Sequence, residues 1–210
     1  MRAGTVVALC WCQGPKERMR LESTISINAY SGLMSDARQV PSPNCDDRPL
    51  GAAVRLLVIH NISLPPGIFG GPQIDDFFRN QLNPDAHPFF QEIAHVRVSS
   101  HCMIRREGSV VQYVPFHRRA WHAGASCFEG VPDCNDYSIG IELEGTDTIP
   151  YTQAQYQQLI QVILALLRSY PDLSIDRIVG HQAIAPERKT DPGPAFEWSR
   201  LFEGLRSFNL

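Results

Sequence analysis

Residues 54–61 read VRLLVIHN, an apolar run that ends in two polar side chains. Val54 to Ile59 is short and rich in β-branched residues, which favours a strand buried on both faces. His60 and Asn61 follow at its carboxyl end, where a rigid strand gives way to a loop and functional side chains are often found. The next segment, 62–73, is rich in proline and glycine and is expected to be a loop.

Further strands are predicted downstream of this run. Residues 101–106 and 109–114 are β-like segments joined by Glu107-Gly108, which indicates a hairpin because glycine supplies the positive φ of a tight turn. Residues 137–143 (YSIGIEL) and 177–180 predict two more strands. A hairpin combined with crossover segments predicts a mixed sheet of about five strands.

The clearest helix is predicted over residues 152–170. Thr152 and Gln155 have the spacing of a capping box, and Pro171 ends the segment. Its apolar stripe is formed by Tyr156, Leu159, Ile160, Ile163, Leu164 and Leu167. Shorter helices are predicted near residues 74–78 and over 196–205, so the fold class is α/β (α+β), one domain with a central sheet flanked by helices.

Length and charge limit the possible functions. The chain has 210 residues, about one domain, and 43% of them are hydrophobic. Its net charge is −3 and its sequence pI is about 6.1, without a long basic cluster, so no nucleic acid partner is expected. No stretch approaches the ~18 uncharged apolar residues of a membrane-spanning helix, so no membrane association is expected either.

Two features of the sequence leave alternatives open. Residues 1–34 are interpreted as a poorly ordered extension or a start-site artefact outside a domain of residues 35–210, and a weak apolar run at Ala3–Cys12 is the sequence support for export. The six cysteines form no Cys-x-x-Cys pair and are interpreted as reduced thiols. A loop disulfide between Cys127 and Cys134 is the alternative.

A candidate metal site combines residues that are far apart in the sequence. His60 and His181 each follow a predicted strand, and Asp191 lies in a segment bounded by Pro186 and Pro192. Two imidazoles and one carboxylate form a ligand set used by catalytic zinc, with a fourth position open to water. In an extended segment, Lys189 and Asp191 share a face, so an ammonium group would lie near the metal. The alternative is two structural histidines and a solvated ion pair.

Two further segments carry candidate functional side chains. Glu142 and Glu144 are two residues apart and therefore lie on one face of the predicted strand, where a carboxylate is costly unless it is paired or faces a metal. The residues alone do not decide which of the two is the general base. Trp121-His122-Ala123-Gly124 could form a sugar platform or a peptide groove, although a core tryptophan is equally common.

Several blocks of sequence together resemble a known family. They are LLVIHNISLPPG (56–67), RAWHAG (119–124), CNDYSIGIELEGTD (134–147), YTQAQYQQL (151–159) and GHQAIAPERKTDPG (180–193). In this order they resemble the bacterial N-acetylmuramoyl-L-alanine amidases of the AmpD type. The resemblance implies a zinc enzyme with the fold shared by peptidoglycan recognition proteins and phage amidase lysozymes.

The resemblance also implies roles for individual residues. His60, His181 and Asp191 match the ligands of one Zn²⁺ ion per chain. Glu142 matches the residue that activates the attacking water, and Lys189 matches the residue that stabilises the oxyanion. Substrate-binding positions are matched by Asn61, Arg97 and Trp121.

Two departures from the family pattern accompany these matches. The loop Glu129–Asp133 lacks a basic residue that some relatives carry for the diaminopimelate end of the peptide, and Gln182-Ala183 replaces the commoner Cys-Asp.

The implied reaction is hydrolysis of the amide bond between the lactyl group of (1,6-anhydro)-N-acetylmuramic acid and L-alanine of the stem peptide. We expect a cytoplasmic, monomeric enzyme that recycles anhydromuramyl peptides, which are soluble peptidoglycan fragments, and thereby influences β-lactamase induction. The alternatives are an exported amidase acting on polymeric peptidoglycan and a peptidoglycan-binding module without catalysis. Because all three ligand positions and both catalytic positions are filled, the sequence favours an enzyme.

Overall fold

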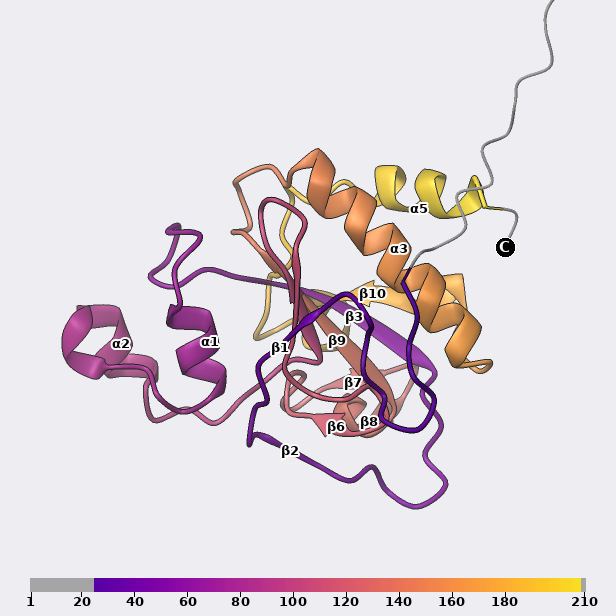
Figure 1. Cartoon of the computed structure of the whole chain (residues 1–210), viewed down its shortest axis with the longest axis horizontal. Helices are drawn as coiled ribbons and strands as arrows, with labels where there is room; N and C mark the ends of the chain where they lie inside the picture. Colours follow the sequence, from indigo (N-terminus) through magenta and orange to yellow (C-terminus); the bar gives the residue numbers. More distant parts are fainter. Residues whose placement is uncertain (1–24, 209–210) are drawn as a thin grey trace, which may run out of the picture.

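A computed structural model describes residues 25–208, and a mixed sheet in the order β1-β5-β4-β9-β3-β10 forms its centre (Figure 1). The strands are β1 (Arg38–Gln39), β3 (Leu56–Ile62), β4 (Cys102–Ile104), β5 (Val110–Gln112), β9 (Ser138–Glu144) and β10 (Ile178–Gly180). Strands β4, β9, β3 and β10 are parallel, and β5 pairs antiparallel with β4 through the predicted hairpin. The mixed sheet is confirmed, with six strands because the two-residue β1 adds an edge.

Helices lie beside this sheet and at one end of it. They are α1 (Gln73–Phe78), α2 (Pro88–Ile93), α3 (Gln153–Ser169), α4 (His181–Ile184) and α5 (Trp198–Arg206), with 3-10 turns η1 (Pro84–Ala86), η2 (Cys134–Asp136) and η3 (Ile175–Arg177). Two small antiparallel pairs join β2 (Cys45–Asp46) to β6 (Arg119–Ala120) and β7 (Cys127–Phe128) to β8 (Val131–Pro132). Helices α3 and α5 lie together on one side of the sheet, whereas α1 and α2 project from one end (Figure 1).

Helix α3 begins where the sequence predicts. The Thr152 side chain accepts a hydrogen bond from the Gln155 backbone N–H, and the Gln155 side chain accepts one from the Thr152 N–H. This reciprocal pair satisfies two N–H groups that have no partner inside the helix. The helix then lays Leu159 and Val162 into the main hydrophobic core.

The two-residue period of a strand divides β3 and β9 between two environments. Odd-numbered side chains of both strands pack in the core beneath α3: Leu57, Ile59, Ile139, Ile141 and Leu143. Even-numbered residues point to the opposite face, which is therefore lined in β9 by Ser138, Gly140, Glu142 and Glu144. We call this second side the polar face of the sheet.

The N-terminal boundary differs from the sequence-based expectation. Ile25 and Met34 are buried in the main core, and a backbone bridge pairs Ile27 with Met34. Residues 25–34 therefore pack with the domain and are not part of an extension, because their apolar side chains fill the core beside Phe116. The remainder of the proposed extension, 1–24, lies outside the described residues.

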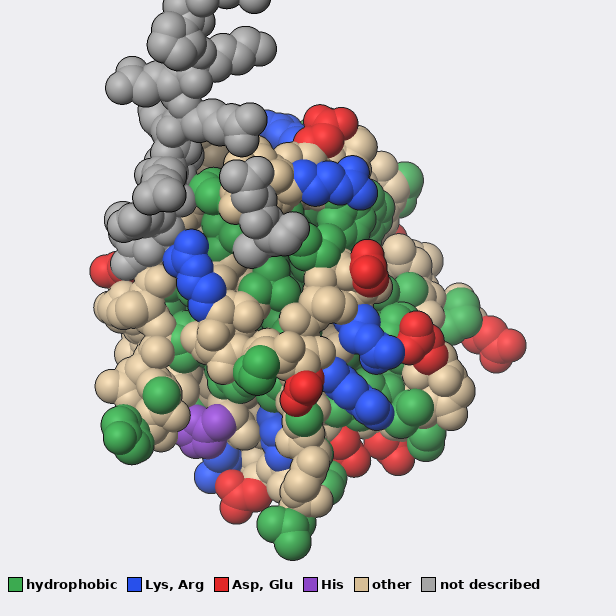
Figure 2. All heavy atoms as spheres, turned by 90° about the vertical axis from the view of Figure 1, so that its right-hand side faces the viewer, with side chains coloured by type: hydrophobic (Ala, Val, Ile, Leu, Met, Phe, Trp, Pro, Cys, Tyr) green, Lys and Arg blue, Asp and Glu red, His purple; other side chains and the backbone are tan. Residues whose placement is uncertain are grey.

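Within residues 25–208 the four cysteines are free. No helix among the same residues is long and apolar enough to cross a bilayer. The Cys134 thiol contacts the Tyr137 hydroxyl at 3.3 Å and is buried, whereas Cys127 is exposed. The two cysteines of the alternative disulfide are thus not bonded to each other in this structure. Basic and acidic side chains are interspersed on the face of the molecule drawn in Figure 2.

Candidate active site

Strand pairing brings His60 and His181 together. Strands β10 and β3 are parallel with Gly180 opposite Ile59, so His181, the first residue of α4, lies beside His60. The two Nδ1 atoms are 3.0 Å apart, and each lies 3.1 Å from Asp191 Oδ2. Candidate ligand atoms of the three residues all lie within 4.8 Å of one another, as binding of a single metal ion requires.

The other nitrogen of each imidazole has a defined partner. His181 Nε2 lies 3.2 Å from the Ala123 carbonyl oxygen, which can only accept, so Nε2 carries the proton and Nδ1 is free to bind a metal. His60 Nε2 lies 2.9 Å from Nδ1 of His122. Both candidate histidine ligands are therefore oriented by groups behind them.

The protonation states suit a metal site. Burial lowers the pKa of His60 to about 4, although the neighbouring Asp191 carboxylate opposes the shift, so the ring is neutral at pH 7. Burial disfavours the charged form of Asp191, but the closeness of the His181 and His60 rings, each 3.1 Å away, outweighs it and lowers the pKa of this carboxyl group. The site thus offers a neutral His60 imidazole and an Asp191 carboxylate beside the Nδ1 atom of His181.

Glu142 lies directly beside this ligand set. The β3–β9 register places it opposite His60, and it is only 7% exposed. Burial, followed by the negative charge of Asp191, raises the pKa of Glu142 well above its usual range, while the positive charge of Lys189 opposes the shift. Its Oε2 has no hydrogen-bond partner among the described residues. A buried carboxylate with an unpaired oxygen is typical of a group that acts on a substrate or a water molecule.

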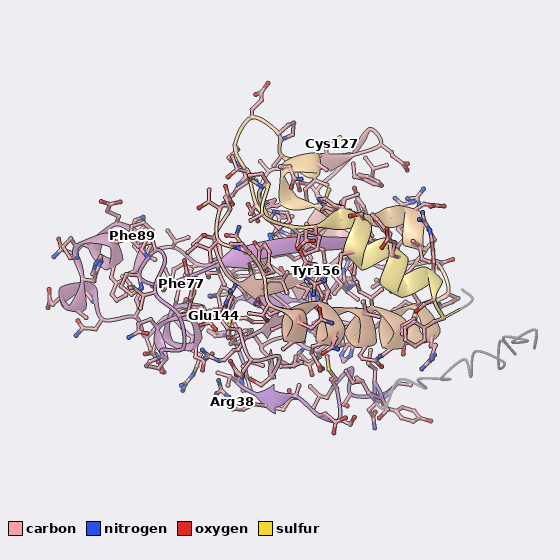
Figure 3. The ribbon with its side chains drawn as sticks, turned by 90° about the horizontal axis from the view of Figure 1, so that it is seen from above. Arg38, Phe77, Phe89, Cys127, Glu144 and Tyr156 are labelled. Atoms are coloured by element: carbon pink, nitrogen blue, oxygen red, sulfur yellow. The ribbon has the colours of Figure 1, made fainter. Side chains whose placement is uncertain are left out.

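Glu144, two residues further along the same strand face, has a different environment. Its carboxylate accepts hydrogen bonds from the backbone N–H groups of Gly70 (2.6 Å) and Arg106 (3.2 Å) and from the Arg105 guanidinium (3.4 Å). Glu144 thereby fixes the loop before α1 to the end of the sheet, and Figure 3 shows it between α1 and α3. Its hydrogen-bonding capacity is used within the fold, which indicates a structural role.

A pocket of about 310 Å³ opens above these groups. Its polar part includes His60, Glu142, His181, Lys189 and Asp191, and its apolar wall includes Phe77, Phe78, Ile93, Val96 and Val98. An adjoining hollow of about 410 Å³ shares Asn61, Phe77 and Ile93 with it and adds Phe89. Phe77 and Phe89 lie at the same end of the molecule, at the α1 and α2 side (Figure 3).

The three residues predicted to bind substrate are placed differently from one another. Asn61 lines both hollows, and its amide donates to Asp147 Oδ1 (2.8 Å) and to the Pro192 carbonyl (3.1 Å). Arg97 is exposed outside the pocket lining, and its guanidinium donates to carbonyls of its own loop. The Trp121 indole donates to Asp46 and likewise does not line the pocket. The structure thus brings Asn61 to the site, and the roles of Arg97 and Trp121 stay predictions.

Sequence reasoning missed one group at the site, the pair His122 and Ser138. The sequence places His122 in a segment predicted to form a sugar platform or a peptide groove, whereas its ring contacts His60 and Ser138. A signal was present in the strand SIGIELE, because Gly140 leaves room on the polar face for a ring. A Cβ added at Gly140 would lie 2.5 Å from Cγ of His122.

Comparisons with known proteins identify the family of this chain. Residues 50–194 match the N-acetylmuramoyl-L-alanine amidase family. The chain is 63% identical over 170 residues to the 1,6-anhydro-N-acetylmuramyl-L-alanine amidase AmpD of Salmonella typhimurium (strain SL1344), covering 81% of this chain and 90% of the relative.

Solved structures extend the comparison to the fold. A crystal structure of a selenomethionine AmpD derivative matches with a TM-score of 0.81 and 58% identity, over 83% of this chain and 97% of that one. The amidase AmiD from E. coli, in complex with anhydro-N-acetylmuramic acid-L-Ala-D-γ-Glu-L-Lys, matches with a TM-score of 0.54 and 29% identity, over 87% and 66% of the two chains. The chain belongs to the N-acetylmuramoyl-L-alanine amidase family.

Proposed function

We propose that this chain is a zinc-dependent amidase that hydrolyses the amide bond between the lactyl group of 1,6-anhydro-N-acetylmuramic acid and L-alanine of the stem peptide. The observation that carries the proposal is the convergence of His60, His181 and Asp191 beside the buried, unpaired Oε2 of Glu142. The name of the Salmonella relative supports the substrate, because that protein is 63% identical over most of both chains.

The residues present fit one zinc ion. Two neutral imidazoles and a carboxylate are zinc ligands, and three protein ligands leave one position for water or substrate. The partner groups behind the two Nε2 atoms leave both Nδ1 atoms directed toward Asp191. When bound, Zn²⁺ supplies a Lewis acid that polarises the substrate carbonyl and lowers the pKa of water.

Glu142 and Lys189 have separate roles in the proposed reaction: Glu142 transfers the proton, and Lys189 stabilises the developing negative charge. Glu142 accepts a proton from the attacking water and passes it to the leaving amine, acting first as base and then as acid. Burial and the charge of Asp191 raise its pKa, which favours uptake of the proton in the first of these two steps. Lys189 lines the same pocket and stabilises negative charge on the carbonyl oxygen, a contribution of about 3–4 kcal/mol for a well-placed donor.

Substrate binding is assigned to the two adjoining hollows. Their apolar wall suits the sugar and the lactyl methyl group, and the polar part receives the scissile amide. We retain Asn61, Arg97 and Trp121 as the proposed substrate-binding residues, with Asn61 supported by its place in both linings.

The proposed setting is the cytoplasm, where a monomeric enzyme would act on soluble anhydromuramyl peptides and thereby influence β-lactamase induction. The support is the 1,6-anhydro substrate in the name of the Salmonella relative. Cell fractionation, together with an assay for peptide release from intact sacculi, distinguishes this setting from an exported amidase acting on polymeric peptidoglycan.

The direct test incubates the purified protein with anhydromuramyl tripeptide, with and without a chelator. We expect release of the free peptide, loss of turnover on chelation and recovery when zinc is restored. Turnover that is unchanged by the chelator contradicts the proposed dependence on zinc. Binding of the substrate without turnover in the presence of zinc identifies a non-catalytic binding module.

A further inference from the structure

A chain of buried hydrogen bonds runs from the candidate ligand His60 to a backbone carbonyl. His60 Nε2 lies 2.9 Å from His122 Nδ1, and His122 Nε2 lies 3.1 Å from Ser138 Oγ. Ser138 Oγ lies 2.5 Å from the Cys134 carbonyl oxygen. All of these side chains are nearly or fully buried, so water does not compete for the bonds.

The carbonyl at the end of this chain fixes its direction. A carbonyl only accepts, so the Ser138 hydroxyl donates its proton to Cys134 and accepts from His122 Nε2–H. In the neutral ring His122 Nδ1 is then without a proton and accepts from His60 Nε2–H. His60 Nδ1 is consequently left without a proton, facing His181 and Asp191.

The His122–Ala123 dipeptide contacts the non-ligating nitrogen of both candidate histidine ligands. The His122 ring orients His60, and the Ala123 carbonyl accepts from His181 Nε2–H at 3.2 Å. Both backbone N–H groups of the dipeptide donate to Asn135 Oδ1, at 3.0 and 2.8 Å. One short segment therefore sets the tautomers of two ligands that come from different elements.

Strand β9 is shaped to receive the His122 ring. Gly140 lies between Ser138 and Glu142 on the polar face, and a Cβ at this position would come within 2.5–2.9 Å of three ring atoms of His122. Contacts that short do not occur without displacement, so any larger residue would push the ring away from His60 or from Ser138. Glycine is required here by the ring and not by a positive φ.

We propose that His122, fixed by Ser138 and Asn135, is a positioning residue that holds His60 in the Nε2–H tautomer and thereby sets the zinc affinity of the site. The inference rests on the proposed zinc site. Partners behind metal-bound histidines commonly change metal affinity or activity by 10–100-fold when they are removed.

The test uses two variants of His122 whose new side chains have nearly the same shape. His122→Asn retains an acceptor near the position of Nδ1, whereas His122→Leu has nearly the same size and no acceptor. Zinc affinity is measured by competition with a chromophoric chelator, and ring ¹⁵N shifts of the zinc-free protein report which nitrogen of His60 carries the proton. His117→Gln, at an exposed histidine, is the control.

We expect His122→Leu to weaken zinc binding by about 10–100-fold and to place part of the His60 proton on Nδ1. His122→Asn should recover most of this loss, and His117→Gln should match the wild type. Equal weakening in the Asn and Leu variants, or wild-type affinity in His122→Leu, overturns the proposal.

Ser138→Ala repeats the test if His122→Leu does not fold. It keeps the ring but removes the acceptor of His122 Nε2–H, so the His122 tautomer is no longer fixed. We expect weaker zinc binding and a mixed His60 tautomer, and an unchanged tautomer and affinity overturn the proposal.

A wild-type protein that binds zinc but lacks amidase activity contradicts the proposed function and leaves the positioning role intact. A wild-type protein that binds no zinc contradicts both.

Discussion

The two faces of the central sheet are built from the same strands but serve different purposes. Beneath α3, the odd-numbered residues of β3 and β9 are aliphatic and fully enclosed, as Leu57 and Ile141 illustrate. On the polar face, the even-numbered residues include His60, Glu142 and Glu144, which are also buried but ionisable. The apolar face supplies the burial that stabilises the fold, and the polar face uses that rigidity to hold costly groups in place.

The comparison also explains how two neighbouring carboxylates acquire different roles. Glu144 is surrounded by donors from Gly70, Arg105 and Arg106, so its charge is compensated within the fold. Glu142 has an oxygen without a partner among the described residues and a pKa raised by burial, which is the environment expected of a group that acts on substrate. The two carboxylates share one strand face, so their different roles come from the hydrogen-bond donors that surround each of them.

The largest expected effect comes from removing the carboxylate of Asp191, which lies against His60 of the polar face. We expect Asp191→Ala to abolish stable zinc binding and to lower amidase turnover by about 10³-fold or more, since a Lewis acid contributes several kcal/mol to the barrier. Zinc content and turnover are measured together, with Asp172→Ala at an exposed carboxylate as the control. An Asp191→Ala protein that retains both would exclude Asp191 as a ligand.

A change on the apolar face should affect stability alone. Leu159 of α3 is fully buried in the main core, so Leu159→Ala should lower the free energy of unfolding by about 2–5 kcal/mol through lost burial and a residual cavity. Zinc affinity of the folded protein should stay at the wild-type value. Urea unfolding and chelator competition on one preparation check both statements, and a large loss of zinc affinity would mean that the two faces are coupled.

The smallest expected effect is a pH dependence from His101, which directly precedes β4 and whose ring centroid lies 5.7 Å from that of His122. Burial, then the charge of Arg48, holds the pKa of His101 well below 6.5, although hydrogen bonds to the Arg118 carbonyl and from Gly140 oppose part of the shift. Above pH 6.5 both the folded and the unfolded states are neutral at this residue. As the pH falls below 6.5 the unfolded state takes up a proton that the folded state does not, so stability falls.

One such histidine contributes up to about 1.4 kcal/mol per pH unit. In zinc-free protein, the slope of unfolding free energy between pH 6.5 and 5 should therefore decrease by about this amount in His101→Asn, which keeps an acceptor for the Gly140 N–H. Identical slopes in the two proteins would show that His101 is protonated in the folded state. Leu159→Ala, altered on the other face, should keep the wild-type slope.

Local sequence signals predicted most of the fold. The capping pair Thr152 and Gln155, the β-branched run before His60 and the Glu107-Gly108 turn each reflect interactions within a few residues. The strand order was not predictable, because β4 and β9 meet through contacts between distant segments. The edge strand Arg38–Gln39 and helix α2 have no periodic pattern long enough to identify them.

The candidate site was predicted in part, for physical reasons that differ from residue to residue. His60 lies near the end of β3 and His181 follows β10, and because these strands are parallel neighbours the sequence positions of the two histidines carried spatial information. Glu142 and Glu144 could not be distinguished by spacing, because a period of two places both on one face. The role of His122 depends on hydrogen-bond partners from Ser138 and Asn135, which no spacing rule relates to it.

The most direct test of these contrasting roles measures turnover and unfolding free energy for Glu142→Gln and Glu144→Gln side by side. We predict that Glu142→Gln binds zinc and remains as stable as the wild type, but loses about 10²–10⁴-fold in turnover. Glu144→Gln should lose about 1–3 kcal/mol of stability and remain active. Wild-type turnover in Glu142→Gln, or an equal loss of turnover in both variants, would contradict the assignment of catalysis to the unpaired carboxylate.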